Sequence, residues 1–308
     1  MVRYSYLGLI VAVLILSFAN TGDAAKIITS GQLGQLDVRI AGEHSIRVTL
    51  RPITFKGQFP ITPMLAEREY NDPVISIQEI EDSIRRRIGN LYVEIQADPL
   101  KVSVTNAEGE EIQDVIFHEE GYLTFKIDEK PILGMGEGGP QIQGNWRNLK
   151  IEFDRRGRLH EMHPRWQSNA YGSRNPVAFM IGTKGWGLFI ATPWGQIDLQ
   201  DEERGRFIPW IPPEPPTENS EGNRRQRNQQ RNRYTQQVQG RPPVDSIING
   251  VYDLFIFDAH EPTNLMKDVS IISSPAVLPP KWSLGYMQSH RELIDSNLKS
   301  EDLLLEEA

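Results

Sequence analysis

The sequence predicts a mainly β fold, an antiparallel β-sandwich, on three observations. Short runs between Gln35 and Asp128 alternate apolar and polar residues, which is the period of a half-buried strand. Clusters of glycine, asparagine and aspartate separate these runs, as turns do. Further along, Pro279 and Pro280 precede the apolar run Trp282–Met287, which is typical of a buried strand opening a second domain.

The first segment, residues 1–25, predicts a secretory signal peptide. Arg3 supplies the positive start, Leu7–Leu16 an apolar core, and Gly22–Ala24 the small residues of a cleavage site. The apolar core is shorter than the about 20 residues that span a bilayer, so we expect cleavage rather than an uncleaved anchor. The mature chain is then expected to be secreted or periplasmic, with no membrane span after cleavage.

Composition narrows the classes of function. The 308 residues carry a formal net charge of -8, which argues against a general polyanion binder. The sequence has no cysteine, and this excludes thiol catalysis, dithiol redox chemistry and thiolate zinc sites.

The alternating runs give the expected strands of the first half. They are Leu36–Ile40, Ser45–Leu50, Leu91–Ile95, Leu100–Thr105, Glu111–Ile116 and Gly121–Ile127. The stretch Pro60–Ile88 breaks this rhythm, and we interpret it as an irregular connection with a helical turn as the alternative for Ile75–Ile88.

A glycine-rich stretch follows, with Gly134, Gly136, Gly138 and Gly139 around Glu137. A phosphate-binding loop would need a strand before it and a helix after it, whereas a proline and another strand follow here. We therefore predict a turn that requires positive φ.

The region after this turn should contain a strand at Leu149–Phe153, a turn at Asp154–Gly157 and a return strand at Arg158–Met162. His160 and His163 suit a metal site only on a helix. In a strand they point to opposite faces, so we interpret them as polar strand-end residues and expect no metal.

The best hairpin lies between Val177 and Leu199, with its turn at Thr183–Gly185, and Ile247–Asp258 resumes the sheet. Trp186 and Trp194 are expected in the sandwich core. Between these strands, residues 217–243 are rich in arginine, asparagine and glutamine and poor in apolar residues, which predicts a disordered basic insertion. Because interleaved aromatic residues are lacking, we expect no nucleic-acid binding.

Three ordered motifs carry a family resemblance. The segment LPPKWSLGYMQSHREL (278–293) resembles the start of the catalytic barrel in glycoside hydrolase family 31, the α-glucosidase and α-xylosidase family. Ile132–Glu137 is similar to that family's YGLGE turn, and Phe179–Ile190 to its hairpin. The resemblance implies a galactose-mutarotase-like amino-terminal sandwich at residues 26–274. Residues 275–308 would then be the linker and the first strand and helix of a truncated (β/α)8 barrel.

The resemblance implies a retaining α-glycosidase, which uses two carboxyl groups about 5 Å apart. In the family both are aspartates on later barrel strands, the nucleophile in a WxDMNE-like motif that this sequence lacks. A whole barrel takes about 250 residues. We therefore expect no catalytic residue in this chain and no hydrolysis by it alone. The expected partner of the full-length relative is an α-glucoside or α-xyloside, with no cofactor.

The family's loop over the barrel mouth often supplies an aspartate to the sugar, but no aspartate lies between Asp154 and Asp198. The remaining candidates for substrate binding are Arg165, Trp166, Gln167, Gln288, His290 and Arg291.

Two alternatives remain open. One is a stand-alone carbohydrate-binding or protein-interaction module, with Trp146, Trp166 or Trp210 as an exposed aromatic platform. The other is an epimerase, which needs a histidine acid and a glutamate base that face one sugar.

Overall fold

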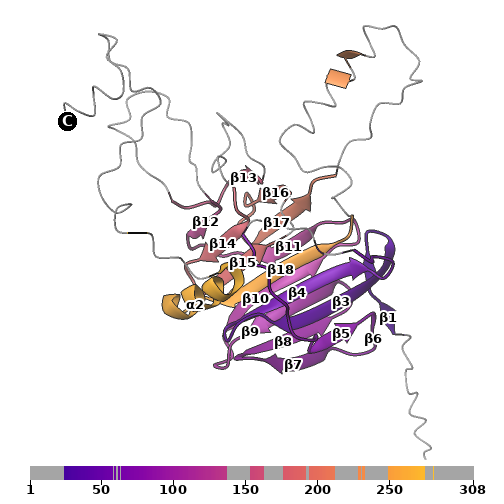
Figure 1. Cartoon of the computed structure of the whole chain (residues 1–308), viewed down its shortest axis with the longest axis horizontal. Helices are drawn as coiled ribbons and strands as arrows, with labels where there is room; N and C mark the ends of the chain where they lie inside the picture. The colour runs from indigo at the N-terminus through magenta and orange to yellow at the C-terminus, as the bar shows by residue number, and fades with distance from the viewer. Residues whose placement is uncertain are drawn as a thin grey trace, which may run out of the picture. The chain divides into compact units, whose positions relative to one another are not determined.

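A computed structural model gives the fold of the protein (Figure 1). The structure describes residues 24–57, 59, 62, 64–136, 153–162, 176–191, 194–211, 228–229, 231–232, 249–274 and 280. The chain divides into two units between Ser273 and Ser274, and every strand described below lies in the first. Two large antiparallel sheets pack against each other, which confirms the predicted mainly β sandwich.

The first sheet, sheet I, has eight strands. In spatial order they are β7 (Ile84–Ile88), β8 (Leu91–Gln96), β9 (Leu100–Thr105), β10 (Glu111–Phe117), β11 (Leu123–Lys126), β17 (Arg204–Pro209), β16 (Gly195–Asp198) and β13 (Leu159–Glu161). The chain runs in sequence order from β7 to β11, so these strands form a meander. Strand β7 is therefore an edge of sheet I in the described part of the chain.

The second sheet, sheet II, joins distant parts of the sequence. In spatial order its strands are β12 (Ile132–Gly134), β14 (Phe179–Gly182), β15 (Trp186–Ile190), β18 (Tyr252–Asp258), β4 (Ser45–Pro52), β3 (Gln32–Ile40) and β2 (Ile28–Thr29), with β5 (Ile75–Ile77) also paired to β3. The short strands β1 (Ala25–Lys26) and β6 (Glu79–Ile80) pair with each other. Strand β4 in the first third of the chain thus lies beside β18 in the last third.

The core forms because alternate side chains of each strand point between the sheets. In β8, for example, Leu91, Val93 and Ile95 are fully buried while the residues between them are half-buried. Strand β18 is instead buried on both faces, since Phe255 and Phe257 pack outside sheet II under a helix.

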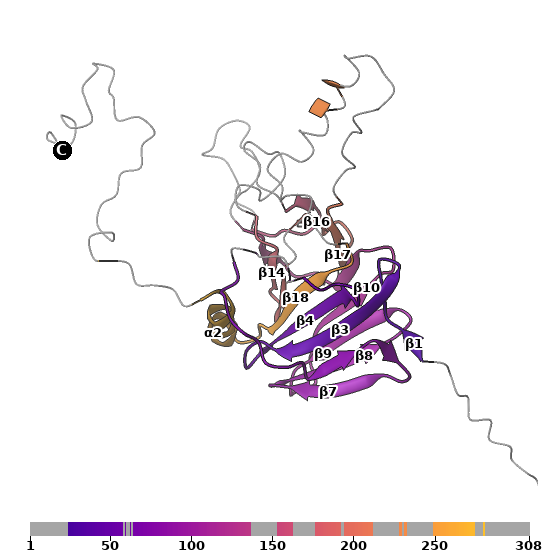
Figure 2. The same ribbon diagram turned by 45° about the vertical axis from the view of Figure 1, so that its right-hand side comes forward.

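That helix is α2 (Pro262–Ser273), which both views place beside β18 (Figures 1 and 2). It buries Leu265 and Ile272 against the outer face of sheet II. The Asp268 carboxylate is also buried, and it accepts a hydrogen bond of 2.8 Å from the backbone N–H of His44. A side chain at Gly42 would collide with this carboxylate, so the glycine allows the β3–β4 turn to meet α2. This helix was not predicted from the sequence.

The outer face of sheet II also holds a buried ion pair. Arg47 on β4 donates from Nε and Nη2 to the two carboxylate oxygens of Asp253 on β18, at 2.8 and 2.7 Å. The side chains of Arg47 and Asp253 are 14% and 1% exposed. The rings of Tyr70 and Phe255 lie 4.4 and 5.4 Å from the guanidinium carbon. Burial lowers the pKa of Arg47, but the hydrogen bonds and charge of Asp253 outweigh it and raise the pKa, so Arg47 stays charged.

The interpretation of Ile75–Ile88 as irregular or helical was wrong, because this stretch forms β5, β6 and β7. Ile75 and Ile80 are buried where β5 pairs with β3 and β6 pairs with β1. Tertiary pairing, rather than local alternation, decides these short strands.

The predicted hairpin is confirmed as β14 and β15, joined through the Thr183–Gly185 turn. Trp186 lies in the core as expected, but Trp194 is only partly buried. It immediately precedes β16, and its carbonyl accepts a hydrogen bond of 3.0 Å from the backbone N–H of Trp210. The signal segment to residue 23, the strand at 149–152, most of the basic insertion and the barrel segment other than Pro280 lie outside the described residues. In the described part of the chain, no helix is long and apolar enough to cross a membrane.

Candidate functional site

The glycine-rich turn after β12 has the predicted positive φ as far as Gly136, while Glu137, Gly138 and Gly139 lie outside the described residues. Gly134 and Gly136 have φ values of 95° and 82°, and Met135 between them has 72°. The buried Met135 donates its N–H to the carbonyl of Phe179 at 2.9 Å. A Cβ atom at Gly134 would strike that same carbonyl, so only glycine fits this close approach. The turn thereby connects the first family-like motif, on β12, to the second, on β14 and β15.

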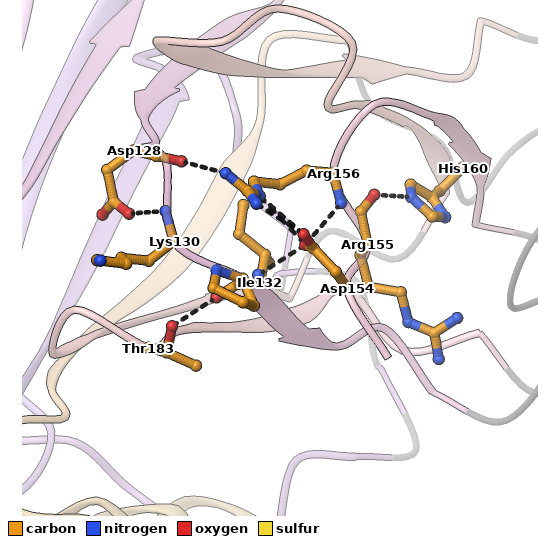
Figure 3. Close-up of polar contacts among 9 residues, drawn as sticks. Asp128, Lys130, Ile132, Asp154, Arg155, Arg156, His160 and Thr183 are labelled. Carbon is orange, nitrogen blue, oxygen red and sulfur yellow. Dashed lines mark hydrogen bonds and ion pairs between the residues drawn. The ribbon is translucent and has the colours of Figure 1, made fainter. Parts of the chain in front are cut away.

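A charged network supports this turn from the segment Asp154–Arg156 (Figure 3). Asp154 Oδ1 accepts hydrogen bonds from the backbone N–H groups of Ile132 and Arg156, at 3.0 and 3.1 Å. The Arg156 guanidinium donates to the same carboxylate at 2.8–3.2 Å and to the carbonyl of Asp128 at 3.2 Å. Partial burial alone would raise the pKa of Asp154, but the hydrogen bonds from Arg156 and the backbone hold the pKa below its ordinary value.

Arg155 and His160 complete the network on the other side of the segment (Figure 3). The buried Arg155 donates from Nε to the carbonyl of Gly134 at 3.0 Å. Its own carbonyl accepts from Nε2 of His160 at 2.8 Å, so this nitrogen carries the proton. His160 lies on β13 and is fully buried. Its ring therefore fixes the backbone beside the glycine turn, and His163 lies outside the described residues.

An open groove adjoins the network. Its lining includes Asp128, Glu129, Arg156 and Lys184, and farther along the ion pairs Lys126–Glu111 and Arg204–Asp114, at 2.6 and 2.7 Å. No aromatic side chain is among the described residues that line it. The groove consequently has charged and hydrogen-bonding groups but no platform for the apolar face of a sugar.

All six candidate substrate-binding residues, Arg165, Trp166, Gln167, Gln288, His290 and Arg291, lie outside the described residues. Of the three proposed aromatic platforms, Trp146 and Trp166 also lie outside, and Trp210 is half-buried. No cluster of His, Asp or Glu able to hold a metal ion occurs in the described part of the chain.

Asp154–Gly157 was predicted only as a turn, and its network of contacts was not predicted. The sequence did carry one local signal. An aspartate carboxylate can accept hydrogen bonds both from the backbone N–H and from the guanidinium of an arginine two positions later, as Asp154 does with Arg156. Its contact with Ile132 and Gly134 depends on tertiary structure.

Comparison with known proteins gives a fold but no close relative. No protein-family model and no curated protein matches the sequence. The GH31 (glycoside hydrolase family 31) dextranase FjDex31A from Flavobacterium johnsoniae, solved with isomaltotriose and with glucose, matches with a TM-score of 0.54 and 11% identity over 82% of this chain. A xylosidase from Aspergillus niger matches with a TM-score of 0.55 and 14% identity over 92% of the chain.

The chain spans only 27% of the dextranase and 36% of the xylosidase. At these identities the similarity concerns the fold alone. The described β-sandwich therefore has a fold that occurs as one part of a GH31 enzyme.

Proposed function

We propose that this chain is the amino-terminal part of a GH31-type retaining α-glycosidase, in which the sandwich supports a catalytic barrel and shapes one wall of the sugar pocket. The observation that carries the proposal is the fold shared with the GH31 dextranase over 82% of the chain. The substrate of the whole enzyme would be an α-glucoside or α-xyloside. The enzyme would act outside the cytoplasm, after removal of the predicted signal peptide.

The placement of the motifs supports this proposal. The glycine-turn motif and the hairpin motif, separated by more than forty positions in the sequence, lie side by side as β12, β14 and β15. The described residues of these two motifs thus form one continuous piece of sheet II, braced by the Asp154–Arg156 network.

The sequence holds no match to the family's nucleophile motif, so this polypeptide alone should not hydrolyse a glycoside. Catalysis would require the two carboxyl groups of a barrel, and the sandwich would contribute support and pocket shape.

The test uses an antibody against the sandwich. We expect it to detect a species well above 35.1 kDa in the source and to deplete hydrolysis of α-glucosides or α-xylosides from an extract. Residues 26–308, purified alone, should show no hydrolysis above the blank. A native species at or below 35.1 kDa, with no activity removed, would contradict the glycosidase proposal. Oligosaccharide and partner binding would then be tested instead.

A further inference from the structure

Strand β7 combines an open sheet edge with three consecutive arginines, Arg85, Arg86 and Arg87. All three side chains are exposed. Among the described residues, no carboxylate lies within 4.0 Å of any of them, whereas Arg39, Arg47, Arg156 and Arg204 each form an ion pair. They lie in a chain whose net charge is -8. Arg87 donates from Nε to the backbone carbonyl of Gly89 at 3.1 Å.

The register of the β7–β8 hairpin shows which backbone groups face outward. Ile88 pairs with Leu91 across the two-residue turn Gly89–Asn90, with a φ of 59° at Gly89. The pair that closes such a turn is hydrogen-bonded, and positions then alternate along the ladder. Arg87 and Arg85 occupy the non-hydrogen-bonded positions, so their backbone N–H and C=O groups point away from β8.

The same two residues place their side chains on one face of the sheet. Arg85 and Arg87 are two positions apart, so their side chains leave the outer face about 7 Å apart. Arg85 lies over the ring of Tyr92, with 5.5 Å between its guanidinium carbon and the ring centroid. Arg86 points to the opposite face and donates to the carbonyl of Arg85 at 2.9 Å. The outward-facing backbone groups of Arg85 and Arg87 and their guanidinium groups therefore lie along the same edge, and the Arg85 carbonyl already accepts one hydrogen bond from Arg86.

The surroundings narrow the class of partner. A second copy of the chain paired through β7 would bring arginines against arginines, which is unfavourable. A long polyanion would also meet the exposed Glu79, Glu81 and Asp82 that precede the strand. A short extended segment with carboxylates at alternate positions matches the spacing of Arg85 and Arg87 and need not reach Glu79 and Glu81. It meets one carboxylate on β8, Glu94, which is paired with Arg85 across the ladder.

We propose that β7 is a docking edge for an extended acidic segment of a partner protein, which joins sheet I as one more strand and sets its carboxylates on Arg85 and Arg87. This inference is independent of the glycosidase proposal, because it uses neither the glycine turn nor any sugar contact.

The test measures fluorescence anisotropy of a labelled peptide, TEVEVET, titrated with the full chain at low salt. We expect saturable binding that weakens at least tenfold in the Arg85→Glu/Arg87→Glu variant. Lys56→Glu/Lys267→Glu, two exposed charge reversals away from β7 in the sequence, is the matched control with the same change in net charge and should leave the affinity unchanged. Circular dichroism and thermal unfolding compare Arg85→Ala/Arg87→Ala with wild type. If this variant folds as wild type does and binds the peptide more weakly, binding has been lost and folding has not.

Two further probes decide whether a strand is added. A peptide N-methylated on alternate residues keeps its charge but cannot pair its backbone, so it should bind at least tenfold more weakly. Inorganic polyphosphate at equal charge should compete poorly. No binding of TEVEVET, equal binding of the methylated peptide, or equally effective competition by polyphosphate would each overturn the proposal.

Discussion

Removal of Asp253 tests whether the buried charge of Arg47 depends on Asp253 for its stability in the fold. Asp253→Leu leaves the guanidinium of Arg47 in a site where its side chain is only 14% exposed. Loss of one partner of a buried pair costs about 3–5 kcal/mol, so the free energy of unfolding should fall by that amount. The double variant Arg47→Met/Asp253→Leu removes both charges and should lie within about 1 kcal/mol of wild type.

Urea denaturation followed by circular dichroism measures these free energies. The control is Lys126→Met in the pair Lys126–Glu111, whose side chains are 50% and 44% exposed, and we expect a loss below about 1 kcal/mol. The reasoning is refuted if Asp253→Leu costs less than about 1 kcal/mol, or if the double variant loses the sum of the two single losses.

Three further changes test other parts of the fold. Gly134→Ala should lower the thermal midpoint more than Gly109→Ala, because both have positive φ but only Gly134 faces a backbone carbonyl; equal shifts would contradict the close approach. Asp268→Ala should cost about 1–3 kcal/mol in urea denaturation and speed hydrogen exchange at the amide of His44, and unchanged exchange would argue against the contact with α2. Because the pKa of Asp154 is lowered in the fold, its carboxylate stabilises the protein at pH values above the unfolded pKa of about 3.9, and this contribution is lost as pH falls through the folded pKa. Asp154→Asn should therefore flatten the acid limb of a curve of unfolding free energy against pH, and an unchanged limb would count against the network.

The parts of the fold that could be predicted are those in which the pattern is local. β8 and β9 alternate residue by residue, and the β14–β15 hairpin carries its own glycine turn. Strand β7 was missed since Ile84 and Ile88 enclose three arginines, a pattern that a buried strand does not show. The extended conformation of β7 depends on its pairing with β8.

The site was less predictable for a related reason. Positive φ at Gly134 and Gly136 follows from glycine itself, and it was confirmed. The roles of Asp154 and Arg155 follow from contacts with residues about twenty positions earlier, which the sequence does not display. The substrate-binding residues stay a prediction, because they lie outside the described part of the chain.

The pairing of β4 with β18 has a consequence for biosynthesis. The 206 positions between Arg47 and Asp253 take about 10–40 s to translate at about 5–20 residues per second. During most of that interval β3 and β4 have emerged from the ribosome, while β18, which pairs with β4 in sheet II, has not yet been synthesised. A chaperone that covers the apolar β4 edge during translation should therefore raise the yield of folded protein more than the same chaperone added after translation has ended.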